Sequence, residues 1–276
     1  MICYPNAKIN IGLHINCKRP DGYHDIETLM LPVPLCDILE ILPVGNAKVP
    51  FEMGVSGIPL DCDSGDNLCR KAFDMLCLHH KLPPVKVHLH KIIPSGAGLG
   101  GGSSDAAFTI RMLNDMFALK LTHEQMISYA SSIGSDCAFF IENTAAVASG
   151  RGEILVDYPY DISEYFLVLV LPDVHVSTAE AYKNCAPYLR EKSIVTIASR
   201  PIHEWKNTLI NDFERSVFNA YPVLEEIKKE LYSMGAVYAS MSGSGSAMYG
   251  LYTDLPETGK LKSQYKLYVF RNNKQI

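Results

Sequence analysis

Alternating hydrophobic and polar residues predict two strands within the first hundred residues. The odd-numbered positions from 7 to 15 are all aliphatic, and the even-numbered ones are polar or glycine. A period of two is typical of a strand with one buried face, so we expect a half-buried strand over residues 6–17. Lys8 and Asn10 then share its polar face. Residues 85–93 alternate in the same way and lead into a glycine-rich segment.

Other periodic segments divide the rest of the chain into strands and helices. Residues 35–43 and 49–55 have the composition of strands, and residues 166–171 form a wholly apolar run that predicts a buried strand. Helical spacing of apolar residues predicts helices from Asn67 to about residue 80, from Ser103 onward, and from a capping box at 122–125 to Gly134. A glycine–serine turn at 242–246 separates two further apolar runs.

Composition narrows the class of protein. The chain has 276 residues, 47% hydrophobic and 20% charged, with a net charge of −5, which suits two modest globular domains. We place the boundary near residue 158, giving domains 1–158 and 159–276. The basic residues are scattered, which argues against a nucleic-acid surface. No apolar run is long enough to span a bilayer, and the first residues lack the features of a signal peptide.

The eight cysteines show no CxxC pair and no zinc-binding spacing. We therefore expect reduced cysteines in a cytoplasmic protein.

The segment from Pro94 to Asp105 carries the clearest chemical signal. It contains five glycines and three serines between a predicted strand and a predicted helix, and two of the serines, Ser103 and Ser104, lie at its end. Glycine allows positive φ and close approach of a ligand to the backbone, and the free amides at a helix start attract anions. The segment therefore predicts a phosphate-binding loop.

Three phosphate-binding patterns can be compared with this segment. The pattern G-x-x-x-x-G-K-[ST] is absent from the chain. The dinucleotide pattern G-x-G-x-x-G matches at Gly96, Gly98 and Gly101, but the acidic residue expected about 20 positions later, after a second strand, is missing. The third pattern, P-x-x-x-G-L-G-x-S-S, fits with one extra glycine, and its two hydroxyls suit Mg²⁺ and phosphate oxygens.

This third pattern resembles the ATP-binding motif of the galactokinase, homoserine kinase, mevalonate kinase and phosphomevalonate kinase (GHMP) superfamily. Residues 5–13 and 241–246 resemble two more motifs of that superfamily. Residues 19–24 (RPDGYH) and 134–140 (GSDCAFF) resemble its branch whose substrate is 4-diphosphocytidyl-2-C-methyl-D-erythritol. The resemblance runs from about residue 2 to 252. It departs from the common pattern at Asn6, Ala97 and Ala138, none of which is a charged functional position.

The resemblance implies a two-domain α/β (α+β) protein. Its N-terminal domain would have the fold of the second domain of ribosomal protein S5, and its C-terminal domain would be ferredoxin-like. The implied reaction transfers a phosphoryl group from ATP, with Mg²⁺, to the 2-hydroxyl of the cytidine-linked substrate. Asp136 would be the catalytic carboxylate, and Lys8 would favour its ionised form and stabilise charge on the transferred group.

The resemblance also assigns binding residues. The ATP site would comprise Pro94, Ser95, Gly96, Ala97, Gly98, Leu99, Gly100, Gly101, Gly102, Ser103, Ser104, Asn67 and Lys91, with Ser104 also on the Mg²⁺ side. The second substrate would be bound by Asn10, Tyr23, His24, Thr178, Tyr182 and Gly243, with Tyr23 and Tyr182 as aromatic walls for the base.

Structural alternatives remain for several of these residues. Asp136, Asn67 and either Ser103 or Ser104 could simply cap helices, and a lysine on a polar strand face is usually solvated. Three other functions also remain: a kinase for homoserine or a mevalonate derivative, a non-catalytic ligand sensor on the same fold, and a dinucleotide-dependent oxidoreductase. We expect only small-molecule partners, with no nucleic acid or membrane, and a monomer or weak homodimer.

Overall fold

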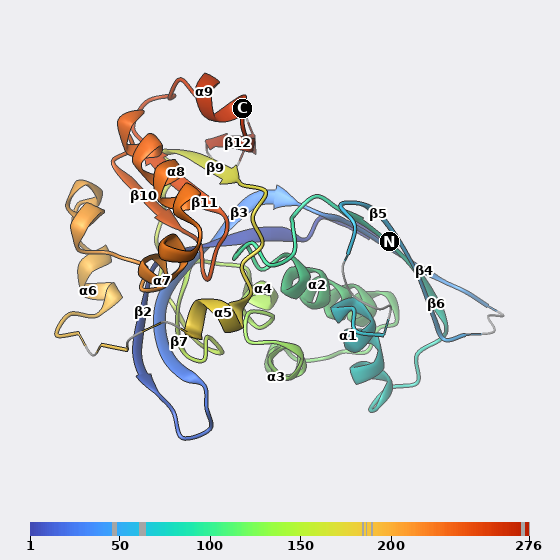
Figure 1. Cartoon of the computed structure of the whole chain (residues 1–276). Helices are drawn as coiled ribbons and strands as arrows, with labels where there is room; N and C mark the ends of the chain where they lie inside the picture. The colour runs from blue at the N-terminus through green and yellow to red at the C-terminus, as the bar shows by residue number, and fades with distance from the viewer. Residues whose placement is uncertain are drawn as a thin grey trace. The chain divides into compact units, whose positions relative to one another are not determined.

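The chain folds into two units, each assembled from separate stretches of sequence (Figure 1). The computed structural model describes residues 1–45, 49–60, 65–183, 185, 187–188, 190–271 and 274–275. Unit 1 comprises Met1–Ala7, Leu35–Ser95 and Gly100–Thr144, and unit 2 comprises Lys8–Pro34, Gly96–Leu99 and Ala145–Ile276. The boundary near residue 158 refers to domains that are continuous in sequence, and it stays a prediction.

Unit 1 combines a mixed sheet with a group of helices. The strand order is β1-β4-β6-β5, and all neighbours are antiparallel except β5 and β6, which are parallel. Helices α1, α2 and α3 pack together, and α2 contacts both β4 and α4. The bounds are β1 (Ile2–Cys3), β4 (Ile38–Pro43), β5 (Phe51–Gly57), β6 (Val85–Lys91), α1 (Leu68–Cys77), α2 (Gly101–Met116), α3 (His123–Ile133) and α4 (Phe139–Glu142).

Local signals in the sequence located these helices to within a few residues. Asn67 caps α1 by accepting a hydrogen bond from the Cys69 amide at 2.8 Å. The capping box at α3 is present: the Gln125 amide donates to Thr122 Oγ1 at 3.2 Å, and the Thr122 amide donates to Gln125 Oε1 at 2.9 Å. Helix α1 ends at Cys77, before residue 80, and α2 begins at Gly101, before Ser103.

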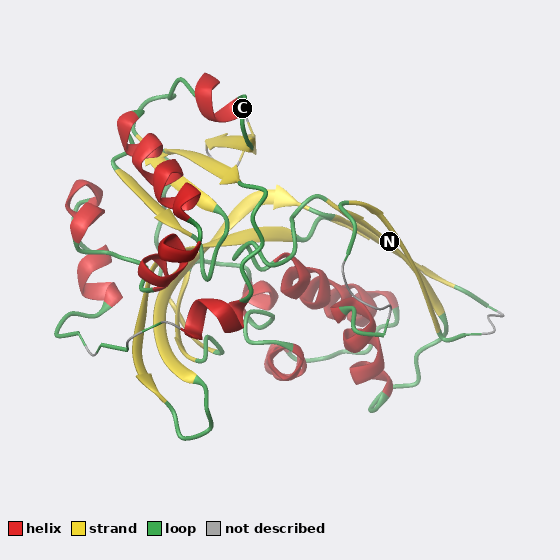
Figure 2. Ribbon diagram, viewed as in Figure 1, coloured by secondary structure: helices red, strands yellow, loops and turns green. Residues whose placement is uncertain are grey.

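Unit 2 contains two antiparallel sheets (Figure 2), of order β2-β3-β7-β8 and β10-β11-β9-β12-β13. Helix α8 packs on β10 and β11. The bounds are β2 (Asn6–Lys18), β3 (His24–Cys36), β7 (Ala146–Gly150), β8 (Ile154–Asp157), β9 (Phe166–Leu171), β10 (Tyr238–Met241), β11 (Met248–Tyr252), β12 (Lys266–Arg271), β13 (Lys274–Gln275), α5 (Thr178–Lys183), α6 (Ile194–Ala198), the 3₁₀ helix η1 (Ile202–Asn207), α7 (Phe213–Ala220), α8 (Pro222–Ser233) and α9 (Gly259–Lys262).

Strand β9 lies in the middle of its sheet, and all six of its residues are buried, as its apolar sequence predicts. Its side chains Val168 and Val170 join a core cluster with residues of α7, α8 and β11, among them Val217, Leu224 and Met248. A central strand that is covered on both faces has apolar residues at every position. The apolar run at 166–171 therefore correctly predicts a buried strand.

Strand β2 differs from the half-buried strand that its alternation predicts, because both of its faces are buried over most of its length. At Gly12 its polar face is covered by the segment around α6 and η1, because an ideal Cβ there would lie 2.7 Å from Leu209 Cδ1 and 3.4 Å from Ile194 Cδ1. Polar residues on this face are therefore held in the interior, which requires hydrogen-bond partners for them.

The prediction of a strand over 35–43 is confirmed from Ile38 to Pro43, which form β4. Its first two residues belong instead to β3, which ends at Cys36, and Asp37 separates the two strands. The sequence gives little signal for the long strand β3, because Pro32 and Pro34 lie within it and proline, which removes a backbone donor, usually argues against a strand.

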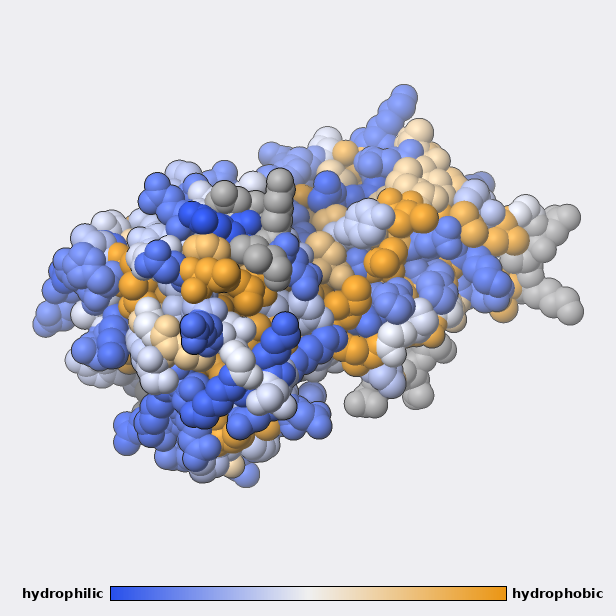
Figure 3. All heavy atoms as spheres, turned by 90° about the horizontal axis from the view of Figure 1, so that it is seen from above, coloured by the Kyte–Doolittle hydropathy of each residue, from blue (hydrophilic) through white to orange (hydrophobic). Residues whose placement is uncertain are grey.

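Two further expectations concern cysteines and membranes. The seven cysteines among the described residues are all free thiols, while Cys62 lies outside the described residues. Within the described ranges, no helix combines the length and apolar character that crossing a membrane requires. On the face drawn in Figure 3, hydrophilic residues surround small hydrophobic patches.

The capping box of α3 gives a test of the fold. Replacing Thr122 with alanine leaves the Gln125 amide without its acceptor, so we expect the free energy of unfolding to fall by about 1 kcal/mol. Urea denaturation measures this change. Thr122→Ser keeps the hydroxyl and serves as the control. An unchanged midpoint in Thr122→Ala would mean that the cap contributes nothing to stability.

Candidate active site

The glycine loop before α2 has the backbone conformation that its sequence predicts. Gly96, Gly98 and Gly100 all have positive φ, at 67°, 73° and 69°. An ideal Cβ at Gly98 would lie 1.9 Å from the carbonyl oxygen of Ser242, so only glycine fits this position without movement of the backbone. The loop therefore depends on glycine both for its conformation and for a close backbone contact.

Helix α2 begins directly after this loop without a side-chain cap. Its N-cap is Gly100, which has no side chain that could accept a hydrogen bond from the first turn. The alternative that Ser103 or Ser104 caps this helix is therefore wrong. The Ser104 Oγ is buried and has no hydrogen-bond partner among the described residues. A first turn with uncapped amides at the positive end of a sixteen-residue helix favours anion binding.

The glycine–serine turn at 242–246 packs against the first glycine loop within unit 2. Ser242 Oγ donates to the Gly98 carbonyl at 2.8 Å and accepts from the Asn10 amide at 3.1 Å. The Ala247 amide donates to the Ala97 carbonyl at 3.1 Å. Gly243 also has positive φ, 54°, and an ideal Cβ there would lie 3.1 Å from Asn10 Oδ1. The two turns and β2 thus form one hydrogen-bonded cluster.

Lys8 and Asn10 lie in this cluster, on the same face of β2 as predicted. Lys8 is only 3% exposed, and its Nζ donates to Asn10 Oδ1 at 2.5 Å and to the Gly98 carbonyl at 3.0 Å. Asn10 Nδ2 donates to Thr28 Oγ1 at 3.1 Å. The alternative of a solvated lysine is therefore wrong. The ammonium group is held beside the glycine loop, where it can stabilise negative charge.

Asp136 is half-buried in the turn between α3 and α4 of unit 1. The N-cap residue of α4 is Ala138, which makes no side-chain cap, so Asp136 does not cap that helix. The amide of Cys137 closes the turn by donating to the Gly134 carbonyl at 3.1 Å.

Lys91 and Asn67, both predicted to contact the nucleotide, lie in unit 1 in structural positions. Lys91 Nζ donates to Asp37 Oδ2 at 2.5 Å and to Asp105 Oδ2 at 2.9 Å, and all three side chains are buried. Burial alone lowers the pKa of Lys91, but the two carboxylates outweigh this effect and raise it. Burial also raises the pKa of Asp105, although Lys91 opposes the shift. This geometry favours a structural role for Lys91, as the capping bond does for Asn67.

An aromatic cluster in unit 2 includes two of the predicted substrate residues. The rings of His24 and Tyr182 are stacked, with centroids 4.6 Å apart and an interplanar angle of 12°. Tyr182 also contacts Phe213 edge-on at 4.8 Å. Burial and then the charge of Lys18 lower the pKa of His24, which favours the neutral imidazole. These rings offer flat apolar surfaces beside a group that can hydrogen-bond.

Tyr23 and Thr178 lie outside this stack. The Tyr23 ring is 55% exposed, with the Arg151 guanidinium 5.0 Å from its centroid. Thr178 is exposed, and its Oγ1 lies 3.4 Å from Ser244 Oγ in the second glycine turn. The structure therefore brings His24, not Tyr23, against Tyr182.

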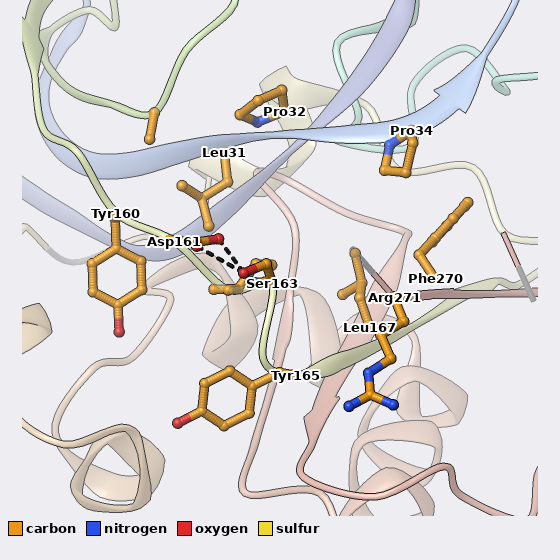
Figure 4. Close-up of a pocket in the computed structure, with 12 residues that line it drawn as sticks. Leu31, Pro32, Pro34, Tyr160, Asp161, Ser163, Tyr165, Leu167, Phe270 and Arg271 are labelled. Atoms are coloured by element: carbon orange, nitrogen blue, oxygen red, sulfur yellow. Dashed lines mark hydrogen bonds between the residues drawn. The ribbon is translucent and has the colours of Figure 1, made fainter. Parts of the chain in front are cut away.

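A cavity of about 120 Å³ in unit 2 is lined by residues of β3, β9, β12 and the segment before β9 (Figure 4). Figure 4 shows Asp161 bonded to Ser163, with Tyr160 to the left of that pair and Tyr165 below it. None of the predicted site residues lines it, so this cavity is separate from the candidate site.

Several residues that hold the site together were missed in the sequence. Asn211 Nδ2 donates to the Met241 and Gly243 carbonyls, both at 2.8 Å, and Tyr249 donates to the Asn10 carbonyl at 2.9 Å. An ideal Cβ at Gly96 would lie 2.4 Å from His175 Cε1. Only Ser242, within the second turn, had a sequence signal. Asn211, Tyr249 and His175 belong to no recognisable motif.

Comparison with known proteins identifies the class to which this chain belongs. The model of the GHMP kinases N terminal domain matches residues 67–149, and that of the GHMP kinases C terminal domain matches residues 199–268. The two matches lie on either side of residue 158. They define the class of protein, a GHMP kinase of two mixed α/β domains, as the sequence predicts.

Close relatives refine this class. The 4-diphosphocytidyl-2-C-methyl-D-erythritol kinase of Bacteroides fragilis (strain YCH46) is 51% identical over 92% of each chain, and that of Bacteroides thetaiotaomicron is 51% identical over 94% of this chain and 95% of its own. A crystal structure of 4-(cytidine 5'-diphospho)-2C-methyl-D-erythritol kinase has a TM-score of 0.80, with 28% identity over 98% of both chains. The chain belongs to the family of these kinases, and the resemblance inferred from its motifs is confirmed.

More distant structures share the fold. The Methanococcus jannaschii mevalonate kinase has a TM-score of 0.69 at 12% identity, over 98% of this chain and 97% of its own. Membership of a kinase family makes this chain a phosphotransferase, for which ATP is the implied phosphoryl donor.

The contact between the two glycine turns gives a second test. In Gly98→Ala the new Cβ would collide with the Ser242 carbonyl at a positive φ, so we expect the free energy of unfolding to fall by about 1–3 kcal/mol. Gly102→Ala is the matched control, because the nearest atom to its Cβ, Leu68 Cδ1, lies 3.6 Å away. Thermal denaturation of both variants measures the difference. Equal melting temperatures would contradict the steric argument.

Proposed function

We propose that this protein transfers the γ-phosphoryl group of ATP to the 2-hydroxyl of 4-diphosphocytidyl-2-C-methyl-D-erythritol. The products are ADP and the 2-phosphate, in the non-mevalonate route to isoprenoid precursors. The observation that carries the proposal is the identity of about one half with kinases named for this substrate, over nearly the whole chain. The glycine turns, the Lys8 cluster and the aromatic pair supply the chemistry that this reaction needs.

The nucleotide would bind through its phosphates. The uncapped first turn of α2 offers backbone amides to phosphate oxygens, and the residues from Pro94 to Ser104 form the loop around them. Lys8 adds a positive charge beside Gly98. These groups stabilise the charge that spreads over the transferred phosphoryl group.

Magnesium fits this arrangement in one respect. Ser104 Oγ is a buried hydroxyl without a hydrogen-bond partner among the described residues, and a hydroxyl in that position suits a hard cation. The described residues contain no group of three His, Cys, Asp or Glu side chains able to hold a metal ion. The ion would therefore depend on phosphate oxygens for most of its ligands. When bound, it neutralises charge on the nucleotide.

Asp136 would act on the second substrate. Such a carboxylate would accept or orient the proton of the attacking hydroxyl, in addition to the positioning and charge stabilisation on which phosphoryl transfer mainly depends. Asn10, whose Oδ1 accepts from Lys8, would bind the hydroxyl or diphosphate of the substrate.

The cytidine base would be recognised by the aromatic residues. A centroid distance of 4.6 Å leaves no room for a base between His24 and Tyr182, so binding on the Tyr182 face requires His24 to move aside and contact the edge of the base. Tyr23, with its exposed ring, would supply the second wall. Thr178 and Gly243 would complete the substrate site.

The proposed reaction also implies the remaining properties of the protein. Its partners would be the two small-molecule substrates alone. We propose a monomer or weak homodimer located in the cytoplasm, with continuous domains 1–158 and 159–276.

The decisive experiment measures ADP formation by the purified protein with ATP, Mg²⁺ and the cytidine-linked substrate. We expect turnover that chelation of Mg²⁺ abolishes. Asp136→Asn should reduce kcat by about 10²–10⁴-fold because it removes the proton acceptor, while ADP still binds. Asp115→Asn, on the exposed side of α2, is the control. Near-normal turnover in Asp136→Asn would contradict the catalytic role of Asp136. If the wild-type protein formed no ADP, the result would favour a ligand sensor.

Base stacking gives a separate prediction. Tyr23→Ala should raise KM for the cytidine-linked substrate about tenfold, because stacking on a base contributes about 1–3 kcal/mol, and should leave KM for ATP unchanged. Tyr4→Ala is the control, because Tyr4 is similarly exposed. Competition by CMP should weaken in parallel. Equal changes in both KM values would contradict the stacking role, and absent competition by CMP would favour another small-alcohol kinase.

A further inference from the structure

A buried cluster of three charges connects the end of β6 with the first turns of α2 in unit 1. The Lys91 ammonium lies between Asp37 and Asp105, at 2.5 Å and 2.9 Å, and the three side chains are 1%, 0% and 4% exposed. Asp105 follows directly on Ser104, so the cluster lies next in sequence to the residues proposed to bind phosphate. The ion pairs therefore join two segments that are 14 residues apart.

The carboxylate of Asp37 also fixes the backbone that leads into the glycine loop. Asp37 Oδ1 accepts hydrogen bonds from the amides of Ile92 at 2.5 Å and Ile93 at 2.9 Å, immediately after β6 ends. A carboxylate that accepts two amides and an ammonium is strongly held. The position of Asp37 thus determines where the chain leaves the sheet.

The first helical residue rests directly on this cluster. An ideal Cβ at Gly101 would lie 2.8 Å from Ile93 Cγ2 and 3.2 Å from Lys91 Nζ. The absence of a side chain lets the start of α2 approach the lysine closely. A displacement of the Lys91 side chain would therefore also shift the backbone amides of the first turn of α2.

The composition of the cluster is costly for stability alone. Two carboxylates share one ammonium in the interior, and Asp105 Oδ1 has no hydrogen-bond partner among the described residues. Buried charges carry a desolvation penalty that hydrophobic residues of similar volume avoid. Hydrophobic residues could pack this space, but they could not hold the backbone after β6 and the start of α2 by hydrogen bonds and ion pairs, as this cluster does.

We propose that Lys91, Asp37 and Asp105 are positioning residues for nucleotide binding. They hold the first turn of α2 against the end of β6, so that its amides are already oriented when phosphates arrive. This inference rests on the proposed function in one respect, that the ligand of this turn is ATP or ADP. In this proposal Lys91 orients the backbone that binds the nucleotide, instead of contacting the nucleotide directly as the family resemblance implies.

Two substitutions at Asp105 separate positioning from charge. Asp105→Ala and Asp105→Asn both remove one negative charge and leave Lys91 paired with Asp37, but only asparagine keeps an oxygen that can accept from Lys91. If charge alone mattered, both variants would bind an anion slightly better than wild type. Positioning instead predicts that Asp105→Ala binds ADP about tenfold more weakly than Asp105→Asn.

The measurement is the Kd of ADP by calorimetry, well below the melting temperature of each variant, together with KM and kcat. We expect KM for ATP to rise in Asp105→Ala while kcat and KM for the second substrate change less than twofold. Ile110→Ala is the matched control, since Ile110 is buried further along the same helix. It should lower the melting temperature with an unchanged Kd of ADP. Equal Kd values for both Asp105 variants would overturn the inference.

A second variant covers the case in which Asp105→Ala does not fold. Lys91→Arg keeps the charge, but the planar guanidinium cannot reproduce both short bonds of the ammonium, so it should fold and bind ADP more weakly. Wild-type ADP affinity in Lys91→Arg would overturn the proposal. Because ADP binding is measured without the second substrate, a wild-type protein that binds ADP but transfers no phosphoryl group contradicts only the proposed function.

Discussion

The close backbone contact between Gly98 and Ser242 is the constraint on which the candidate site depends. It requires a positive φ and no side chain at residue 98, and it brings together turns that lie 144 residues apart. Around it, Ser242 bonds to Asn10, Asn10 to Lys8, and Lys8 back to Gly98. Each of these buried polar groups thus has a hydrogen-bond partner. The bonds restrict the Lys8 side chain to few conformations and so fix its ammonium group in place.

Much of this could be predicted from sequence because the signals are local. The capping box of α3, the apolar strand β9, the glycine loop and the shared face of Lys8 and Asn10 each depend on residues a few positions apart. The motifs also placed the chain in its family correctly. Such features follow from backbone geometry and periodicity, which a single sequence records.

The rest depends on contacts distant in sequence. Nothing local marks Asn211 as the residue that holds the second turn, or Asp37 and Asp105 as the partners of Lys91. The family resemblance assigns Lys91 to the nucleotide, although the fold encloses its side chain between two carboxylates. The burial of the polar face of β2 has the same cause, because its cover comes from residues near 98, 194, 209 and 242.

Helices α2 and α3 begin in opposite ways. Thr122 and Gln125 satisfy two amides at the start of α3 with side chains of the same helix, whereas Gly100 has no side chain to offer α2. A phosphate bound at α2 would act as the missing N-cap, so part of that helix's hydrogen bonding would be supplied by the nucleotide. Occupancy of the site and the stability of unit 1 would then be thermodynamically linked, and the protein would be most resistant to unfolding when its nucleotide is abundant.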